Sequence, residues 1–440
     1  MSSELLQQVR VLDPVSDHDR VADVLIEDGV IRAIADTLSD YPSETIVQDG
    51  RGLILGPGLV DLYSHSGEPG SEERETLRSL ARAAAAGGFT RIAILPDTIP
   101  AVDNPGSVAW MQKRWWAVSG DRSQASEATP TPYPPYPTPQ LYCWGALTLG
   151  AEGQQMTELG ELAATDIVGF ADGRSLTNWL LIRRVLEYLK PLQKPVALFS
   201  SDSNLTGNGV MREGPSSLQF GLPGIPAIAE TVPLLALLEC VETIGTPVHL
   251  MRISTARGVA LVRAAKARGV PITASTTWMH LLLNSRAIGR YDPNLHICPP
   301  LGNPADQEAL QQAVQEGIID AIAIDHTPYT YEEKTVSFAE APPGAIGLEL
   351  ALPLLWQSLV ETGQWTALAL WRSLSTRPAL CLQQKVAAIA PGKPAELTLF
   401  DPKLAWTVNG PSLQSIARNT PWLEQTVTGR VVKTWTGDNG

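Results

Sequence analysis

The chain has 440 residues, of which 44% are hydrophobic and 18% are charged, and its formal net charge is −13 at pH 7. This length and hydrophobic content suit one barrel of ordinary size with a smaller appendage, and they exclude a small module. The acidic charge balance argues against nucleic acid or an anionic membrane as the main partner.

The first eight residues lack a basic segment followed by an apolar one, and no apolar run reaches membrane-spanning length. We therefore expect a cytoplasmic protein with no membrane partner. The four cysteines are Cys143, Cys240, Cys298 and Cys381. They show no Cys-x-x-Cys spacing, so they predict neither a disulfide framework nor a zinc cluster.

Both ends of the chain have the pattern of short β-strands. Near the N-terminus, β-branched and apolar runs at 21–27 and 30–34 flank Asp28-Gly29, which predicts a hairpin. The tail repeats this character at 395–400 and 427–434. We expect residues 1–55 and 385–440 to form one small β-sandwich built from both termini.

Residues 56–384 alternate strand-like and helical runs. For example, residues 75–86 are rich in Ala and Arg and predict a helix, and residues 90–95 predict the next strand. This alternation predicts an α/β fold with a parallel sheet, as a parallel barrel requires. Residues 121–140 are rich in Pro, Ser and Thr, which predicts an exposed insertion.

Polar side chains follow several of the predicted strands. Asp61, Tyr63 and His65 alternate along the first barrel strand and therefore share one face. Asp172 and Asp325 stand at the ends of two later strands. Because the C-terminal ends of barrel strands carry the active sites of such folds, this end is the candidate site.

The segment 56–70, Gly-Pro-Gly-Leu-Val-Asp-Leu-Tyr-Ser-His-Ser-Gly-Glu-Pro-Gly, is similar to the first barrel strand of the amidohydrolase superfamily. Its Gly-Glu-Pro-Gly narrows the resemblance to the dihydroorotase and allantoinase branch. Segments 209–214, 221–230 and 317–329 also match, so the resemblance covers nearly the whole chain. It implies a TIM-type (β/α)8 barrel in which metal-bound hydroxide attacks a cyclic amide and a carboxylate transfers the proton.

Three positions differ from the metal-binding residues that the resemblance implies. Tyr63, Phe199 and Arg252 each stand where a metal-binding His is expected. A benzyl ring offers no lone pair to zinc, and a guanidinium stays positively charged and repels a cation. These changes predict that a binuclear metal site is lost.

Three residues that could bind a metal remain at the metal-binding positions implied by the resemblance. They are His65, Asp172 and Asp325. They could hold a single zinc ion, since three protein ligands suffice for a catalytic zinc. Asp325 also corresponds to the carboxylate that transfers the proton in active members. The alternative is a hydrogen-bonded polar cluster with Arg252 as counter-ion, which we prefer.

The chain also differs at positions where the resemblance implies substrate-binding residues. Gly67 stands where a substrate-binding Arg is expected, Asp97 where an Asn is expected, and Tyr329 where a His is expected. Cys298 and Gly302 also occupy positions of polar family residues. For Asp97 and Asp172, an ordinary carboxylate in a turn is an equally good interpretation.

The resemblance therefore predicts a dihydroorotase-like protein of pyrimidine biosynthesis without an intact binuclear site and without a cofactor. We expect it to serve a structural or regulatory role, with aspartate transcarbamoylase or further copies of itself as partner. The alternative is an active dihydroorotase with an unusual mononuclear zinc site. A third interpretation, metal-free chemistry around Asp325 and His326, has no motif to support it.

Overall fold

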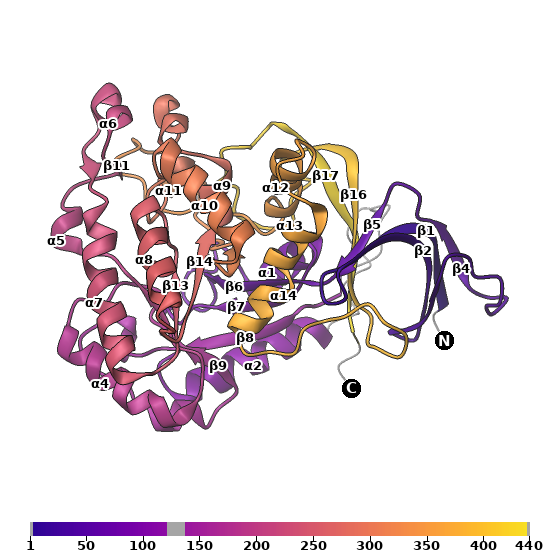
Figure 1. Ribbon diagram of the computed structural model, residues 1–440, viewed down its shortest axis with the longest axis horizontal. Coiled ribbons are helices and arrows are strands. Elements are labelled where there is room, and N and C mark those ends of the chain that lie inside the picture. The colour runs from indigo at the N-terminus through magenta and orange to yellow at the C-terminus, as the bar shows by residue number, and fades with distance from the viewer. Residues whose placement is uncertain (1–2, 121–136, 438–440) are drawn as a thin grey trace.

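The computed structural model describes residues 3–120 and 137–437 (Figure 1). Most of the predicted insertion, residues 121–136, lies outside the described residues. Within the described ranges, no helix combines the length and the apolar character that crossing a membrane requires.

Two four-stranded parallel sheets form the barrel, in the orders β6-β7-β8-β9 and β10-β13-β14-β15. A bridge from Phe170 to Val196 joins them at one seam. At the other seam, the amide of His65 donates to the carbonyl of His326 over 2.8 Å. The predicted (β/α)8 barrel is therefore confirmed. Its strands are β6 (Leu59–Ser64), β7 (Phe89–Ile94), β8 (Gln140–Gly145), β9 (Ile167–Phe170), β10 (Ala197–Phe199), β13 (Val248–Met251), β14 (Ile272–Thr277) and β15 (Ala321–Ala323).

Helices follow the barrel strands, and the longer of them cover the outside of the barrel, whereas α6 projects from a loop (Figure 1). They are α1 (Leu77–Ala86), α2 (Pro105–Gly120), α3 (Leu159–Ala163), α4 (Trp179–Leu189), α5 (Ser203–Thr206), α6 (Pro215–Phe220), α7 (Ile228–Ile244), α8 (Ala256–Ala267), α9 (Trp278–Leu282), α10 (Pro304–Glu316), α11 (Tyr331–Lys334), α12 (Ala351–Leu355), α13 (Ala367–Leu374) and α14 (Thr376–Cys381). The loop between β10 and α7 contains a two-stranded sheet of β11 (Met211–Arg212) and β12 (Gly224–Ile225).

Strands from both ends of the chain join in one seven-stranded sheet beside the barrel. They are β1 (Ser3–Asp13), β2 (His18–Glu27), β3 (Val30–Ala35), β4 (Ile46–Asp49), β5 (Ile54–Pro57), β16 (Glu396–Thr407) and β17 (Thr426–Thr436). The hairpin predicted at Asp28-Gly29 is confirmed, and both residues have the positive φ that a two-residue turn of this kind requires. Twelve buried apolar residues of this sheet and its flanks form a separate hydrophobic cluster.

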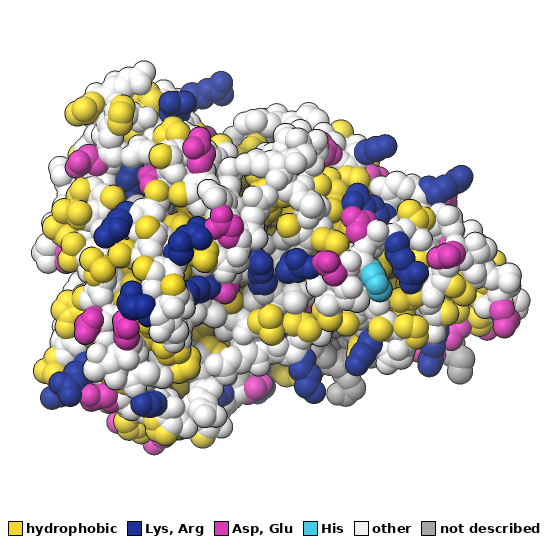
Figure 2. Space-filling view, viewed as in Figure 1, with side chains coloured by type: hydrophobic (Ala, Val, Ile, Leu, Met, Phe, Trp, Pro, Cys, Tyr) yellow, Lys and Arg dark blue, Asp and Glu magenta, His cyan; other side chains and the backbone are white. Residues whose placement is uncertain are grey.

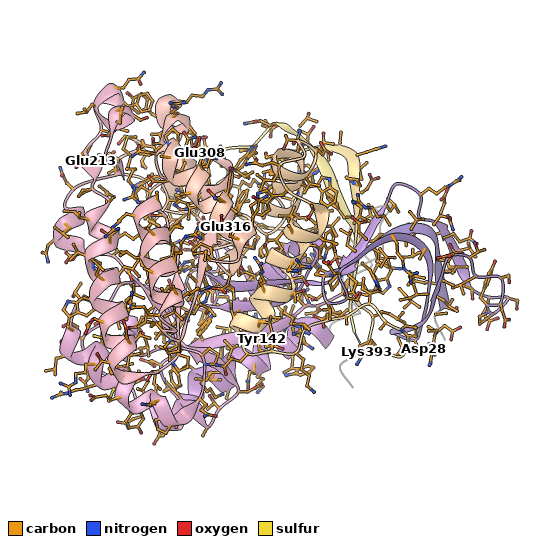
Figure 3. The ribbon with its side chains drawn as sticks, in the orientation of Figure 1. Asp28, Tyr142, Glu213, Glu308, Glu316 and Lys393 are labelled. Atoms are coloured by element: carbon orange, nitrogen blue, oxygen red, sulfur yellow. The ribbon has the colours of Figure 1, made fainter. Side chains whose placement is uncertain are left out.

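The terminal sheet is curled, and its edge strand β3 forms hydrogen bonds with the segment that leads into β16. Ile31 of β3 donates to the carbonyl of Lys393 over 2.9 Å and accepts from Gly392 over 2.8 Å. Figure 3 shows Asp28 and Lys393 at the same end of this sheet. The curl protects the edge of β3 from pairing with another chain.

The segment 56–58 leads from the terminal sheet into the barrel under the indole of Trp371. A Cβ at Gly56 would lie 2.1 Å from that ring, so only glycine fits. The indole Nε1 donates to the carbonyl of Pro57 over 2.8 Å. This close approach fixes the start of β6, which delivers the first residues of the candidate site.

A shielded ion pair also connects barrel and terminal sheet. Arg91 of β7 donates from Nε and Nη2 to the two oxygens of Glu396 of β16 over 2.7 and 2.6 Å. Its Nη1 donates to the carbonyl of Lys385 over 2.7 Å. The two side chains are only 11% and 13% exposed, so solvent screens the pair weakly.

We predict that Glu396→Gln lowers the free energy of unfolding by about 3 kcal/mol, because Arg91 then keeps a buried charge without a carboxylate. Urea unfolding of the full chain measures this. The matched control is Glu187→Gln, which removes the exposed pair of Glu187 with Arg183 and should change stability by less than about 0.5 kcal/mol. Equal effects of the two substitutions would contradict the structural role of the buried pair.

Candidate functional site at the barrel mouth

A two-pronged ion pair lies at the C-terminal end of the barrel. Arg252, directly after β13, donates from Nε to Asp325 Oδ2 over 2.8 Å and from Nη2 to Oδ1 over 2.5 Å. The side chains of Arg252 and Asp325 are 5% and 13% exposed. Both residues adopt left-handed backbone, with φ of +56° and +53°, which costs about 1 kcal/mol each. Paired geometry of this kind is among the strongest for a guanidinium and a carboxylate.

The Arg252 guanidinium has further partners, namely a backbone carbonyl and two aromatic rings. Its Nη1 donates to the carbonyl of Gly173 over 2.8 Å. Its Cζ lies 5.4 Å from the centre of the Tyr63 ring and 5.3 Å from that of Phe199, within the range of cation–π attraction. The structure therefore gathers into one cluster the three residues that stand at expected metal-binding His positions.

His65 links this cluster to a second carboxylate. Its Nδ1 lies 2.8 Å from Asp97 Oδ2, and its Nε2 lies 3.6 Å from Asp325 Oδ1. Burial opposes protonation, but the charges and hydrogen bonds of the two carboxylates raise the pKa of His65 to about 9. An imidazolium cannot accept the hydrogen bond that Arg252 Nη2, 3.2 Å from Nε2, would donate. The two cations instead share the carboxylate of Asp325.

Both carboxylates of this network stay ionised. Burial raises the pKa of Asp325, but the Arg252 charge and the hydrogen bonds of His65 and Arg252 outweigh it and lower the pKa to about 2. Burial opposes ionisation of Asp97 as well, and the charge of His65 leads the effects that hold its pKa below the ordinary value. Two anions and two cations thus alternate along the mouth, and their formal charges sum to zero.

A hydrogen-bonded chain lies below the ion pair inside the barrel. The Tyr63 hydroxyl lies 2.8 Å from Ser275 Oγ and accepts from the amide of Arg252 over 3.2 Å. Ser275 Oγ is also 2.8 Å from Nε2 of His249, whose Nδ1 lies 2.8 Å from Thr273 Oγ1. Burial lowers the pKa of His249 to about 3, so this imidazole is neutral. Sequence reasoning missed Ser275, although the alternation of Thr273 and Ser275 along β14 places both on one face.

Asp172 does not join His65 and Asp325. Its Oδ1 accepts from the amides of Leu147 and Thr148 over 2.7 and 3.1 Å, and its Oδ2 accepts from the Thr148 hydroxyl over 2.6 Å. The carboxylate therefore fixes the loop after β8. As zinc ligands, His65, Asp172 and Asp325 remain a prediction, and such a site would require Asp172 to leave all three partners.

The arrangement at the mouth does not fit a metal ion. In residues 3–120 and 137–437, no three His, Cys, Asp or Glu side chains come close enough to hold one. Both oxygens of Asp325 face a guanidinium, which is a cation and offers no lone pair.

Gly67 and Gly302, which stand where the resemblance implies polar substrate-binding residues, are tightly enclosed by neighbouring atoms. A Cβ at Gly67 would lie 2.4 Å from the carbonyl oxygen of Ser71 and 2.5 Å from that of Glu75. A Cβ at Gly302 would lie 2.6 Å from Cβ of Asp306. The loop after β6 has no room for an arginine at position 67. In this loop conformation, only glycine fits at position 67.

Cys298 and Tyr329 also border this end of the barrel. Residue Cys298 as a whole is exposed, but the surrounding protein shields its thiol from water and raises the pKa of that thiol despite the charge of Arg252. The ring of Tyr329 lies 4.9 Å from Arg74 Cζ and 5.3 Å from Lys334 Nζ. Two cationic side chains, those of Arg74 and Lys334, therefore lie beside the Tyr329 ring.

Family models and curated relatives agree on the ancestry of the chain. Residues 52–123 match the model described as dihydro-orotase-like, and residues 238–439 match that of the amidohydrolase family. The chain is 45% identical over 447 residues to a "Probable dihydroorotase-like protein" of Synechocystis sp., covering 98% of this chain and 99% of that protein. It is 36% identical to a "Dihydroorotase" of Syntrophus aciditrophicus, covering 98% and 97%.

Solved structures support the fold alone. L-Hydantoinase from Arthrobacter aurescens superposes with a TM-score of 0.81 at 19% identity, covering 100% of this chain and 97% of that structure. The relatives above exceed 30% identity over nearly the full length of the chain. By fold and by sequence, the chain belongs to the dihydroorotase-like amidohydrolase family.

Proposed function

We propose that this protein acts in pyrimidine biosynthesis without an intact binuclear metal site and without hydrolytic activity, in a structural or regulatory role. One observation carries the proposal, the paired hydrogen bonds of Arg252 with Asp325. The carboxylate that would bind metal and transfer the proton in active members is already neutralised by a side chain of the same protein.

Electrostatics explains why a metal would compete poorly at this position. A guanidinium stays protonated at any physiological pH, so a divalent cation beside it meets like charge in a shielded environment. Removing Arg252 from Asp325 would also leave a buried cation without its partner, which costs about 3–5 kcal/mol. A metal ion would have to overcome both costs.

For the partner, we propose aspartate transcarbamoylase. The support is the family resemblance, since degenerate dihydroorotase homologues can assist assembly of that enzyme. Mixing the two purified proteins and measuring the mass of the resulting particle tests this. Two separate components at micromolar concentration would count against the proposal.

The alternative function is an active dihydroorotase with a mononuclear zinc at His65, Asp172 and Asp325. The curated relatives favour it, because proteins 36–37% identical over 98% of this chain carry the name dihydroorotase. The amidohydrolase match agrees with a hydrolytic ancestor. The geometry of the mouth and the names of the relatives thus favour different functions, and direct measurement separates them.

We predict that the full chain, purified without chelator, contains far less than one zinc per molecule. We also predict no ring opening of dihydroorotate and no cyclisation of carbamoyl-aspartate above the buffer rate, because Arg252 already binds both oxygens of Asp325 and Gly67 offers no side chain to a substrate. Metal analysis by mass spectrometry and a coupled absorbance assay measure the two quantities. One zinc per chain together with turnover would establish the alternative.

We predict that Asp325→Asn lowers the free energy of unfolding by about 3–5 kcal/mol, because the charge of Arg252 loses its carboxylate. The double variant Asp325→Asn with Arg252→Met should recover most of this loss, since it removes both charges. Urea unfolding of the wild type and both variants measures the effect. Unchanged stability of the single variant, or equal losses in both, would contradict the ion pair as the central contact.

A further inference from the structure

Arg212, the second residue of β11, is the least exposed arginine of the described chain. Three arginines are buried there, with exposed fractions of 9% for Arg91, 5% for Arg252 and 2% for Arg212. Arg91 and Arg252 each bind a carboxylate through two hydrogen bonds. Within residues 3–120 and 137–437, Arg212 has no carboxylate at ion-pair distance, and its guanidinium donates to a hydroxyl instead. Such a charge is costly, because it has lost its water without gaining an anionic partner.

The hydrogen bond of Arg212 leads to a carboxylate only indirectly. Its Nη2 donates to Ser254 Oγ over 2.8 Å. The Ser254 hydroxyl and amide both donate to Oε2 of Glu230, and the Thr255 hydroxyl donates to Oε1 over 2.7 Å. Both oxygens of Glu230 are thus engaged by neutral donors. Glu230 therefore balances the charge of Arg212 from a distance, and it does not accept from the guanidinium.

Further N–H groups of Arg212 lack an acceptor. A guanidinium carries five N–H bonds, and each of them can donate. The Nε atom is shielded from solvent and has no hydrogen-bond partner in the described part of the chain, where Nη1 has no acceptor either. Buried donors in folded proteins are nearly always satisfied by protein, water or a bound group. The surroundings of Arg212 thus call for an acceptor from outside the chain.

The backbone that carries Arg212 is held from two sides. Arg212 lies opposite Ile225 in the pairing of β11 with β12. The amide of the next residue, Glu213, donates to the carbonyl of Ile225 over 3.0 Å, and the carbonyl of Glu213 accepts from Asn303 Nδ2 over 3.1 Å. A guanidinium on a fixed backbone is pre-organised, which lowers the entropic cost of binding a ligand.

Arg212 also lies near Cys298 at the barrel mouth. Residue Cys298 as a whole is exposed. The surrounding protein raises the pKa of its thiol, whereas the charges of Arg252 and Arg212 lower this pKa. Asp325 acts against the two cations, but Arg252 already binds both of its oxygens. An exposed residue near Arg212 thus lies in positive surroundings, which favour the approach of an anion.

The outer surface at this end of the molecule does not select the sign of a ligand by itself. Figure 1 shows β11 and α6 at the upper left, and Figure 3 shows Glu213 at the same end. Figure 2 shows Lys and Arg mixed with Asp and Glu there. The buried charge of Arg212 therefore decides the sign, because solvent screens it least.

We propose that Arg212 binds a small oxyanion, a carboxylate or a phosphate group, beside Cys298 at the barrel mouth. An oxyanion offers several lone pairs and forms short, charge-assisted hydrogen bonds with a guanidinium. Water can accept from the same N–H groups, but it does not neutralise the charge. The ligand must be small, because Arg212 is only 2% exposed. Arg212 lies outside the metal-binding and substrate-binding positions that the resemblance implies, so this site does not depend on the proposed loss of hydrolysis.

We predict that the full wild-type chain binds inorganic phosphate or acetate in isothermal titration calorimetry at constant ionic strength, and the tighter anion identifies the class. Arg212→Met should weaken this binding about 10- to 100-fold, because it removes the charge-assisted hydrogen bonds. Arg212→Lys should bind with intermediate affinity, since it keeps the charge but not the planar set of donors. The matched control is Arg263→Met, the same change at an exposed arginine of α8 that pairs with Glu316, which should bind like the wild type.

A wild type that binds neither anion would overturn the proposal, and so would equal binding by the wild type and a folded Arg212→Met variant. Circular dichroism checks the folding of each variant. Crystals of the wild type grown with the tighter anion give a second test that needs no variant. The anion should lie within hydrogen-bond distance of the Arg212 guanidinium, and ordered water alone at that position would contradict the site.

Discussion

The ion pair between Arg252 and Asp325 is the contact on which the candidate site depends. Arg252 follows β13 and Asp325 follows β15, and Arg252 also binds the carbonyl of Gly173 after β9. Through Asp325 the network reaches His65 after β6, and through His65 it reaches Asp97 after β7. Five of the barrel strands are therefore connected at their C-terminal ends by one set of charges. Removing any member leaves an uncompensated charge in a poorly solvated place.

This network shows how a protein side chain can balance a carboxylate at the end of a barrel strand. Carboxylates at the end of a barrel need positive charge nearby, and either a bound cation or a protein side chain can supply it. In this chain the guanidinium of Arg252 supplies it, held between the rings of Tyr63 and Phe199. The two rings and the arginine thus form one packed arrangement.

The alternation of elements predicted a parallel α/β architecture, the family resemblance predicted that it closes as a (β/α)8 barrel, and the Asp28-Gly29 pair was sufficient to predict the first hairpin. Residue identities at Phe199 and Arg252 predicted side chains that offer zinc no lone pair, and the loss of a binuclear metal site stays a prediction. The partner of Asp172 could not be predicted, since the amides of residues 147–148 reach it only after the loop folds.

The same limit applies to Asp97 and Gly67. An aspartate in a turn gives no local sign that it will pair with His65 from the preceding strand, 32 residues away. The enclosure of Gly67 by backbone oxygens likewise arises from the path of the following loop. Local pattern thus predicts which residues reach the mouth, whereas their pairing depends on tertiary contacts far apart in sequence.

The most direct test of an internal cation in place of a metal is anomalous X-ray diffraction at the zinc edge from crystals grown with excess zinc. We expect no zinc peak between His65 and Asp325, with the guanidinium of Arg252 on both oxygens of Asp325. A fully occupied zinc at that position, with Arg252 displaced, would contradict it.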